Sequence, residues 1–414
     1  MTTLYATLLG HATLLVEGEG AVLCDPILGD VVSGAGNVID PPRRIDPARL
    51  PPLDAVFISH HHSDHFCLVD LSHVPGARRL PIFAPEGSPV LAELRSAGYD
   101  VRPLRVGQTV GVAGMTVTGT PSSVAFPELG LAFRRGKASL LNLVDTVFHD
   151  HLSSLRELLP HPGLLLAPFQ AGGYMSLLPL RVGGPPAGLA DAITEWSSEY
   201  LTELVQDIEA LGPLHVVPFA DGISYVERAI NRWHFPLPDA VFLGALRRRG
   251  IAATEATAGA CYCVTESGVE RVTRHRGLVT IDGAAVDRSF DPRGVINDTP
   301  RPCTQDVVPV DGLSILLGAI SEAGPLDDAV AEACRDWFLD LCDAPEEWRY
   351  VTLAPGPRIH DVRSMPMPAR ARAYGIRVHA RDLLAVVAGR ISLEQIMLSG
   401  AYRYYSPRSV DSLE

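Results

Sequence analysis

A group of potential metal ligands follows directly after a short apolar segment, and this feature restricts the fold of the chain most. Residues 55–59, Ala-Val-Phe-Ile-Ser, are predicted to form a buried strand, because Asp54 and the prolines before it break any helix. A loop just past a strand end is where an α/β fold exposes its chemistry. The side chains of this loop that can bind metal are those of His60, His62, Asp64 and His65.

The spacing within this loop predicts a site for two metal ions. His60 and His62 alternate, so their side chains can point in the same direction. Asp64 and His65 follow at once and can serve a second ion beside the first. A solvated, histidine-rich turn is the alternative interpretation, but His-x-His-x-Asp-His after a strand is a specific pattern with a reason in ligand geometry.

The remaining pattern of strands and helices indicates a sandwich of two sheets with helices outside. Strands are expected at residues 4–9, 13–17, 21–24, 80–84, 100–104, 138–141, 164–167 and 214–217. A short helix is expected over residues 89–98, and a long amphipathic helix over residues 188–211 ends at Gly212-Pro213. Further on, helices such as residues 327–341 and 381–389 are expected to dominate.

The composition of the sequence changes near residue 250, where short, arginine-rich, strand-like segments begin. We therefore expect two regions. Residues 1–250 would form the metal-binding domain, and residues 251–414 would form a mainly helical accessory region that covers the substrate.

Charge and composition restrict the partners and the compartment. The net charge of −13 argues against nucleic acid and against an anionic membrane surface as a partner. There is no apolar window long enough to span a membrane, and the N-terminus lacks the pattern of a secretion signal. The seven cysteines are scattered and odd in number, which is typical of free thiols in a reducing cytoplasm. No glycine-rich nucleotide loop occurs, so no bound NAD or flavin is expected.

Three motifs together resemble the metallo-β-lactamase superfamily, in the branch of lactonases and acyl-ethanolamine phospholipases. They are Gly10-His11-Ala12-Thr13, Cys24-Asp25-Pro26 and the histidine loop of residues 60–65. The resemblance covers roughly the first half of the chain. It implies an α+β fold, an αββα sandwich with a two-metal site at the sheet edges, and Asp145 as the bridging carboxylate.

The chain departs from the hydrolases of this superfamily at two positions. Residues 121–124, Pro-Ser-Ser-Val, and residues 217–221, Val-Pro-Phe-Ala-Asp, lack the histidines that those hydrolases carry there. Fewer imidazoles and more carboxylates suit iron or manganese better than zinc. Glu128, which lies shortly before the strand of residues 129–133, is the expected replacement ligand, and a solvated loop glutamate is the alternative.

Further segments are similar to the CMP-N-acetylneuraminate hydroxylase group, an oxygenase branch of the same fold. They are residues 128–131, 141–145, 169–173, 218–220 and 399–403. That group carries a Rieske cluster, whose cysteine–histidine pairs are missing here, so the electrons would come from a separate ferredoxin or reductase. Other di-iron oxygenases of this fold, which act in natural-product pathways, have no Rieske domain. The resemblance implies two Fe ions and O2, and hydroxylation of an unactivated carbon in a small-molecule substrate such as a diterpenoid acid or its thioester.

We expect the ligands to divide between the two ions. His60, His62 and Glu128 would hold one ion, Asp64 and His65 the other, and Asp145 would bridge them. The last ligand of the second ion stays open among His379, His234 and Asp221. His11 and Asp25 are expected to orient ligands through hydrogen bonds.

Two other classes of function remain possible from the sequence. A two-zinc lactonase, thioesterase or phosphodiesterase would use a metal-bound hydroxide. A binding protein with a degenerate site would catalyse no reaction, but five potential ligands in positions appropriate to the fold argue against it.

Overall fold

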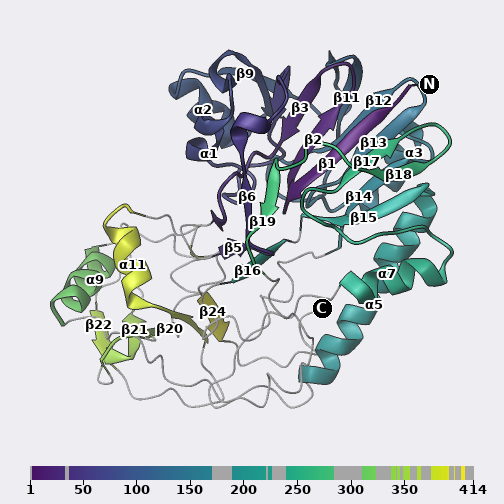
Figure 1. Ribbon diagram of the computed structural model, residues 1–414. Helices are drawn as coiled ribbons and strands as arrows, with labels where there is room; N and C mark the ends of the chain where they lie inside the picture. Colours follow the sequence, from purple (N-terminus) through teal and green to yellow (C-terminus); the bar gives the residue numbers. More distant parts are fainter. Residues whose placement is uncertain are drawn as a thin grey trace.

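The structure is a computed structural model in which two packed sheets form the larger part and a smaller sheet follows towards the C-terminus (Figure 1). It describes residues 2–32, 37–169, 189–220, 222–225, 239–283, 310–322, 337–341, 343–345, 348–354, 361–364, 374–390, 396 and 402–405. Side chains of the first nine residues of the long helix, 189–197, are not described.

The first sheet has eight strands in the order β18-β17-β1-β2-β3-β7-β8-β9. The strands from β18 to β3 are antiparallel, and those from β3 to β9 are parallel. Their bounds are β1 Leu4–Gly10, β2 Thr13–Glu17, β3 Ala21–Cys24, β7 Ala55–Phe57, β8 Pro81–Pro85, β9 Asp100–Leu104, β17 Cys261–Val264 and β18 Val269–Val272.

The second sheet has six strands in the order β10-β11-β12-β13-β14-β15. It is antiparallel up to β13 and parallel beyond it. The bounds are β10 Thr109–Val112, β11 Met115–Thr120, β12 Gly130–Arg135, β13 Ala138–Asn142, β14 Leu164–Pro168 and β15 His215–Phe219.

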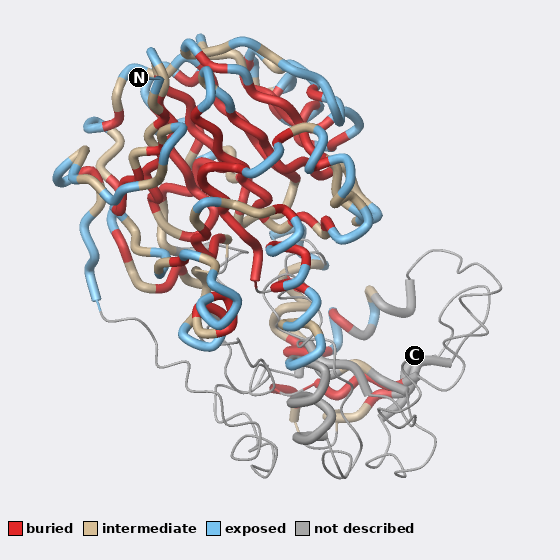
Figure 2. Tube along the Cα trace, turned by 90° about the vertical axis from the view of Figure 1, so that its right-hand side faces the viewer, coloured by how far each residue is buried: buried red, intermediate tan, exposed pale blue. Residues whose placement is uncertain are grey.

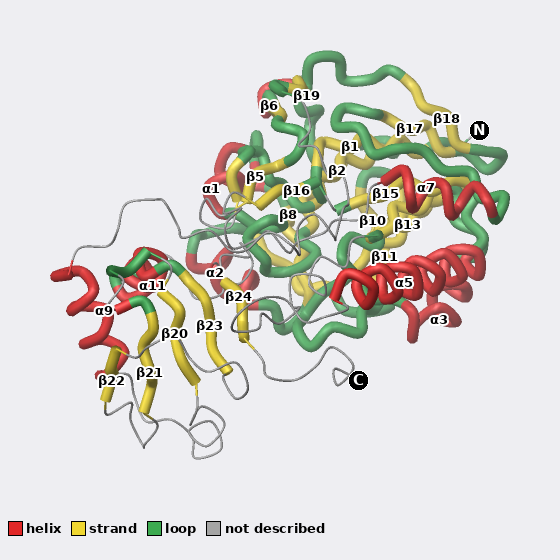
Figure 3. Tube along the Cα trace, turned by 90° about the horizontal axis from the view of Figure 1, so that it is seen from below, coloured by secondary structure: helices red, strands yellow, loops and turns green. Residues whose placement is uncertain are grey.

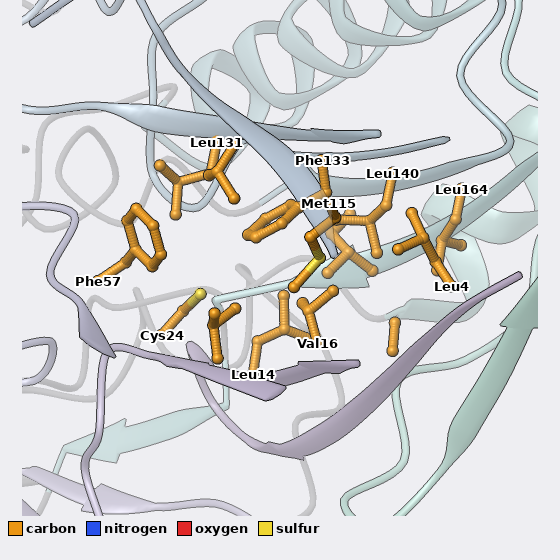
Figure 4. Packing of buried hydrophobic residues seen from close by; sticks show 14 of the residues in the cluster. Leu4, Leu14, Val16, Cys24, Phe57, Met115, Leu131, Phe133, Leu140 and Leu164 are labelled. Carbon is orange, nitrogen blue, oxygen red and sulfur yellow. The ribbon is translucent and has the colours of Figure 1, made fainter. Parts of the chain in front are cut away.

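The two sheets pack face to face over a hydrophobic core. Figure 4 shows Leu14, Val16 and Phe57 of the first sheet facing Leu131 and Phe133 of the second. Each fully buried side chain of this size stabilises the fold by about 2 kcal/mol. The inner strands are therefore buried along most of their length, as the tube in Figure 2 shows, whereas the edge strands β9, β10 and β18 are partly exposed.

Helices cover the outer face of each sheet, which completes an αββα sandwich. Helices α1 (Leu68–His73) and α2 (Pro89–Ser96) share a buried cluster with the first sheet. Helices α3 (Leu152–Leu158), α5 (Leu189–Leu211) and α7 (Asp239–Arg248) share one with the second, and they lie together on that side in Figure 3. None of the described helices is long and apolar enough to cross a membrane.

The predicted fold class and most predicted elements of the sandwich are confirmed. The long helix was expected at residues 188–211 and spans Leu189–Leu211. Helix α2 starts where the sequence predicts it, because Ser88 caps it by accepting a hydrogen bond from the Val90 N–H and Pro89 occupies its first turn.

Short elements complete the sandwich region. Strands β4 (Val31–Val32), β5 (Asn37–Ile39) and β16 (Ile223–Tyr225) form a small sheet, and β6 (Arg43–Ile45) pairs with β19 (Val279–Ile281). The 3-10 turns are η2 Pro47–Arg49, η3 Ala77–Arg79 and η4 His149–His151.

The sandwich extends beyond residue 250. Strand β17 pairs with β1, and β19 pairs with β6, so strands within residues 261–281 pair with strands from the N-terminal part of the chain. The boundary that we expected near residue 250 therefore falls before the last strands of the sandwich. The change of composition there corresponds to β18 at the edge of the sheet, where Glu270 and Arg271 are exposed.

The C-terminal region contains a five-stranded sheet, so the expectation of a mainly helical region is wrong for its described residues. The strands are β20 Trp337–Leu341, β21 Tyr350–Ala354, β22 Asp361–Ser364, β23 Tyr374–Val378 and β24 Tyr402–Tyr405. Two described helices accompany them, α9 (Val310–Glu322) and α11 (Ala380–Val387). Residues 337–341 were expected to be helical, but a short buried run has no periodicity that distinguishes a helix from a central strand.

Candidate metal centre

The loop after β7 folds back on itself and brings two buried imidazoles together. The backbone N–H groups of His65 and Phe66 both donate to the carbonyl of His62, which closes a turn. This turn places the rings of His60 and His65 4.1 Å apart between centroids. Both side chains are fully buried.

Asp145 approaches these imidazoles from the second sheet. It follows β13, where Val144 has a φ of 51° and its N–H donates to the side chain of Asn142. Oδ2 of Asp145 lies 3.1 Å from Nε2 of His65 and 4.0 Å from Nε2 of His60. Residues from strand ends in both sheets therefore meet at one edge of the sandwich, with a carboxylate between two imidazoles.

Asp64 also lies near Nε2 of His65, and His11 lies beside Asp64. Oδ2 of Asp64 is 3.2 Å from Nε2 of His11 and 3.7 Å from Nε2 of His65. The rings of His11 and His65 are 5.1 Å apart and meet edge to face. His11 comes from the turn between β1 and β2, so a third segment of the chain reaches the same place.

Asp25 fixes the orientation of His65. Oδ2 of Asp25 lies 3.0 Å from Nδ1 of His65, and the same carboxylate accepts hydrogen bonds from the N–H and the hydroxyl of Ser59, both at 2.7 Å. With Nδ1 directed at this carboxylate, Nε2 is directed at the site. Contacts of this kind hold metal-binding histidines in place and set their tautomer.

Glu128 lies beside His60, on the side of its Nδ1 atom. It is buried, its Oε2 accepts a hydrogen bond of 2.6 Å from Ser122, and its Oε1 is 3.4 Å from Nδ1 of His60. Glu128 is thus next to the imidazole nitrogen of His60 that faces away from Asp145. Burial is the larger cause and repulsion from Asp145 the smaller one, and together they raise the pKa of Glu128 to about 7.

His62 borders the cluster together with an aromatic ring. Its ring contacts His60 at 4.5 Å and Phe126 at 4.7 Å between centroids. Phe126 also lies 5.7 Å from His60 and 5.3 Å from His61. The sequence analysis missed Phe126, and its place two residues before Glu128 is the only signal that could have indicated it.

The charges in the cluster are strongly coupled. Burial, together with the neighbouring His65 and His62, lowers the pKa of His60 well below its usual value. Burial opposes the charged form of His65 too, but Asp145 and Asp64 raise the pKa of His65 well above its usual value. Burial likewise acts against ionised Asp64, yet His65 and His11 hold the pKa of Asp64 well below its usual range.

Buried polar atoms without hydrogen bonds converge here, as expected of side chains that bind a cation. Among the described residues these atoms include His60 Nε2, His65 Nε2, both ring nitrogens of His11, Asp64 Oδ1 and Glu128 Oε1. The short contacts of His65 with Asp145 and of His11 with Asp64 do not meet hydrogen-bond geometry. An unsatisfied buried polar group costs about 1–3 kcal/mol.

Two groups of side chains fit a metal ion. One contains His11, Asp64 and His65, and the other contains His60, His65 and Asp145; in each, the ligand atoms lie within 4.8 Å of one another. His65 is common to both, and a single Nε2 lone pair can bind one ion only. The residues therefore fit a metal centre in which Asp145 stands between His65 and His60.

The candidates for the last ligand do not join this cluster in the described part of the chain. His379 is buried at the start of α11, where its Nδ1 lies 3.8 Å from Oδ2 of Asp343. His234 and Asp221 lie outside the described residues.

Comparison with known proteins supports the same fold. Residues 21–177 match the profile of the beta-lactamase superfamily domain. The matched segment contains the histidine loop and Asp145. This match confirms the predicted resemblance to the metallo-β-lactamase superfamily. An uncharacterized protein of Mycobacterium tuberculosis is 42% identical over 94 residues, which is 22% of this chain and 24% of that protein. The match thus spans about a quarter of that relative's length.

Two solved structures illustrate the range of similar proteins. CmlA, a diiron beta-hydroxylase from Streptomyces venezuelae, is 15% identical with a TM-score of 0.44, and the alignment covers 66% of this chain and 54% of that one. Igni18, a metallo hydrolase from the archaeon Ignicoccus hospitalis, is 16% identical with a TM-score of 0.41, and the alignment covers 63% of this chain and 98% of that one.

Proposed function

We propose that the centre at the edge of this beta-lactamase superfamily domain binds two iron ions and that the protein is an O2-dependent monooxygenase. Its substrate would be a small molecule with an unactivated carbon, such as a diterpenoid acid or its thioester. The observation that carries the proposal is the buried carboxylate of Glu128 beside His60.

The proposal follows from the kind of donor atoms at the site. Two carboxylates, those of Asp64 and Asp145, lie beside the Nε2 atoms of the imidazoles, and Glu128 adds a third behind His60. Oxygen donors favour iron or manganese over zinc. The segment of residues 121–124 contributes no imidazole. Instead, its Ser122 donates a hydrogen bond to Glu128 and so holds a carboxylate in the site.

The residues of this chain would then have distinct roles. Two bound iron ions would supply the activation of O2, with electrons from a separate ferredoxin or reductase. His60, His62 and His65 would donate nitrogen lone pairs, and Asp145 would donate carboxylate oxygens. Glu128, whose pKa is raised to about 7, can hold a proton beside His60 at neutral pH. Phe126 would keep water from the rings that it covers.

One observation favours a second candidate, a two-zinc hydrolase. Each of the two ligand groups contains two imidazoles and one carboxylate, and a nitrogen-rich set of this kind suits zinc. Two zinc ions would supply a hydroxide for the attack on an ester, lactone or phosphodiester. In that enzyme Glu128 would only orient His60 through Nδ1.

Metal content and reactivity with O2 distinguish the two functions. We expect protein purified without added metal to contain about two iron ions per chain, and the reduced protein to consume O2. Glu128→Ala should lower the iron content, whereas Glu93→Ala on the exposed face of α2 should not. Two zinc ions per chain, with ester hydrolysis that needs neither O2 nor a reductant, would identify the hydrolase instead.

A further inference from the structure

His11 lies in the metal centre on a backbone that few residues other than glycine adopt. Gly10 has a φ of 111° and His11 a φ of 47°, so the turn between β1 and β2 leaves the usual regions at two consecutive residues. A non-glycine residue in such a conformation costs about 1–3 kcal/mol and persists where the surrounding structure imposes it. The conformation directs the imidazole inward, where its side chain is almost fully buried.

A buried arginine holds this turn. The side chain of Arg43 donates from Nε to the carbonyl of Leu9 and from a terminal nitrogen to the carbonyl of Ile27, both at 2.7 Å. It packs so closely that a Cβ atom on Gly10 would lie 2.3 Å from its Nε. The turn is therefore fixed to the loop that carries Asp25, the residue that orients His65.

The other side of the β1–β2 turn packs against the backbone of Gly222. Gly222, which precedes β16, packs so closely that a Cβ atom there would lie 3.1 Å from Cα of His11. Its carbonyl accepts a hydrogen bond of 2.8 Å from the N–H of Asp40, next to the pairing of β16 with β5. His11 thus has little freedom to move away from the site.

The spacing of the neighbouring atoms matches a shared cation. Ligand atoms at about 2.0–2.1 Å from one tetrahedral metal lie roughly 3.3 Å from each other. Oδ2 of Asp64 lies 3.2 Å from Nε2 of His11 and 3.7 Å from Nε2 of His65. Both nitrogens of His11 lack a hydrogen bond within the described part of the chain, although the ring is buried.

We propose that His11 is a ligand of the second cation, which it binds through Nε2 together with Asp64 and His65. The histidine of the β1–β2 turn would then provide the ligand that the sequence left open among His379, His234 and Asp221. This inference rests on the proposed two-metal centre, but it holds for iron and for zinc alike. It replaces the role in orienting a ligand that we had expected of His11.

Two substitutions separate a metal ligand from a hydrogen-bond donor. His11→Asn removes the imidazole but suits the backbone, because asparagine tolerates a positive φ. His11→Gln can still donate a hydrogen bond to Asp64 but has no imidazole nitrogen to bind the ion. His161→Asn is the matched control, because His161 also has a positive φ, of 53°, and is exposed on the surface.

The test is a titration of metal-free protein with Co2+, followed by visible absorption and by metal analysis after dialysis, with circular dichroism as the check of folding. We expect wild type and His161→Asn to bind two cobalt ions. Both His11 variants should bind the second ion at least ~100-fold more weakly and lose its absorption bands.

Other results would contradict the inference. If His11→Gln retained two ions with the wild-type spectrum, His11 would be a hydrogen-bond partner of Asp64 only. If His11→Asn retained both ions, the imidazole would have no part in binding. Wild type that binds a single cobalt ion would instead contradict the two-metal centre of the proposed function.

Discussion

At the scale of single residues, the centre depends on which nitrogen of each imidazole is already occupied. Asp25 lies against Nδ1 of His65, while Ser59 and Glu128 lie against Nδ1 of His60. Both Nε2 atoms are left facing Asp145. The carboxylates behind the rings therefore decide where the lone pairs point, and their loss should disturb metal binding without removing a ligand.

The raised pKa of Glu128 gives a prediction for the stability of the metal-free protein. Glu128 titrates near 7 in the folded protein, against the usual value of 4.5, so folding favours its protonated form. Its contribution to stability is complete below pH 4.5 and is lost as the pH rises through 7. Relative to Glu128→Gln, wild type should lose about 3 kcal/mol of unfolding free energy between pH 4.5 and pH 8.

Urea unfolding of both metal-free proteins at the two pH values measures this difference. Glu93→Gln, an exposed residue of α2, serves as the control and should change little with pH. An equal difference between wild type and Glu128→Gln at both pH values would mean that Glu128 is solvated when folded.

The sequence predicted the identities of the clustered residues better than their contacts. His60, Asp64 and His65 follow one strand and could be found from spacing alone. The place of Glu128 behind His60, and the approach of His11, depend on backbone angles and on how separate loops pack. No local pattern contains that information, so His11 was assigned a lesser role.

At the scale of elements, the β1–β2 turn connects the fold to the centre. The turn carries His11, Arg43 holds it, and the hydroxyl of Thr13 at the start of β2 donates to the carbonyl of Asp25 at 2.7 Å. Residues that bind or orient the cluster are thereby joined through two short strands.

Substitution of Gly10 tests how strictly this turn is built. An added Cβ would need a φ of 111° and would collide with the buried side chain of Arg43. Gly10→Ala should therefore lower the unfolding free energy by on the order of 3 kcal/mol or more. Gly76→Ala is the matched control, because Gly76 also has a positive φ, of 75°, but no atom lies within 4 Å of its added Cβ.

Thermal unfolding of the two variants gives the comparison. Gly76→Ala should lose only about 1 kcal/mol, the cost of the backbone conformation alone. Similar losses in both variants would show that Arg43 moves aside easily and does not hold the turn.

Elements were predictable where periodicity and caps agreed, as in α5 and α2. They were not predictable for Trp337–Leu341, where every residue from Phe338 onwards is buried. A strand that lies between β21 and β23 is covered on both faces, so its sequence shows no alternation of apolar and polar residues.

At the scale of the molecule, the sandwich is closed by residues far from its start. Tyr262 and Val264 of β17 are buried in the core between the sheets, and β17 covers the outer side of β1. A chain that ends at residue 250 would lose about 2 kcal/mol for each of these side chains and would expose β1 as an edge.

We therefore expect a chain of residues 1–283 to fold and to bind metal, whereas a chain of residues 1–250 should aggregate or unfold at a lower temperature. Size-exclusion chromatography and thermal unfolding of the two chains check this expectation. A folded, metal-binding chain of residues 1–250 would show that β17 to β19 are dispensable.

The pair of cations at the sheet edge is the claim on which the other conclusions depend. Anomalous X-ray diffraction from crystals of protein purified without added metal, recorded on both sides of the iron and zinc absorption edges, tests it most directly. We predict two iron peaks, one beside Nε2 of His60 and one beside Nε2 of His65, with Asp145 between them. A single peak, zinc peaks alone, or metal bound away from these side chains would contradict the account.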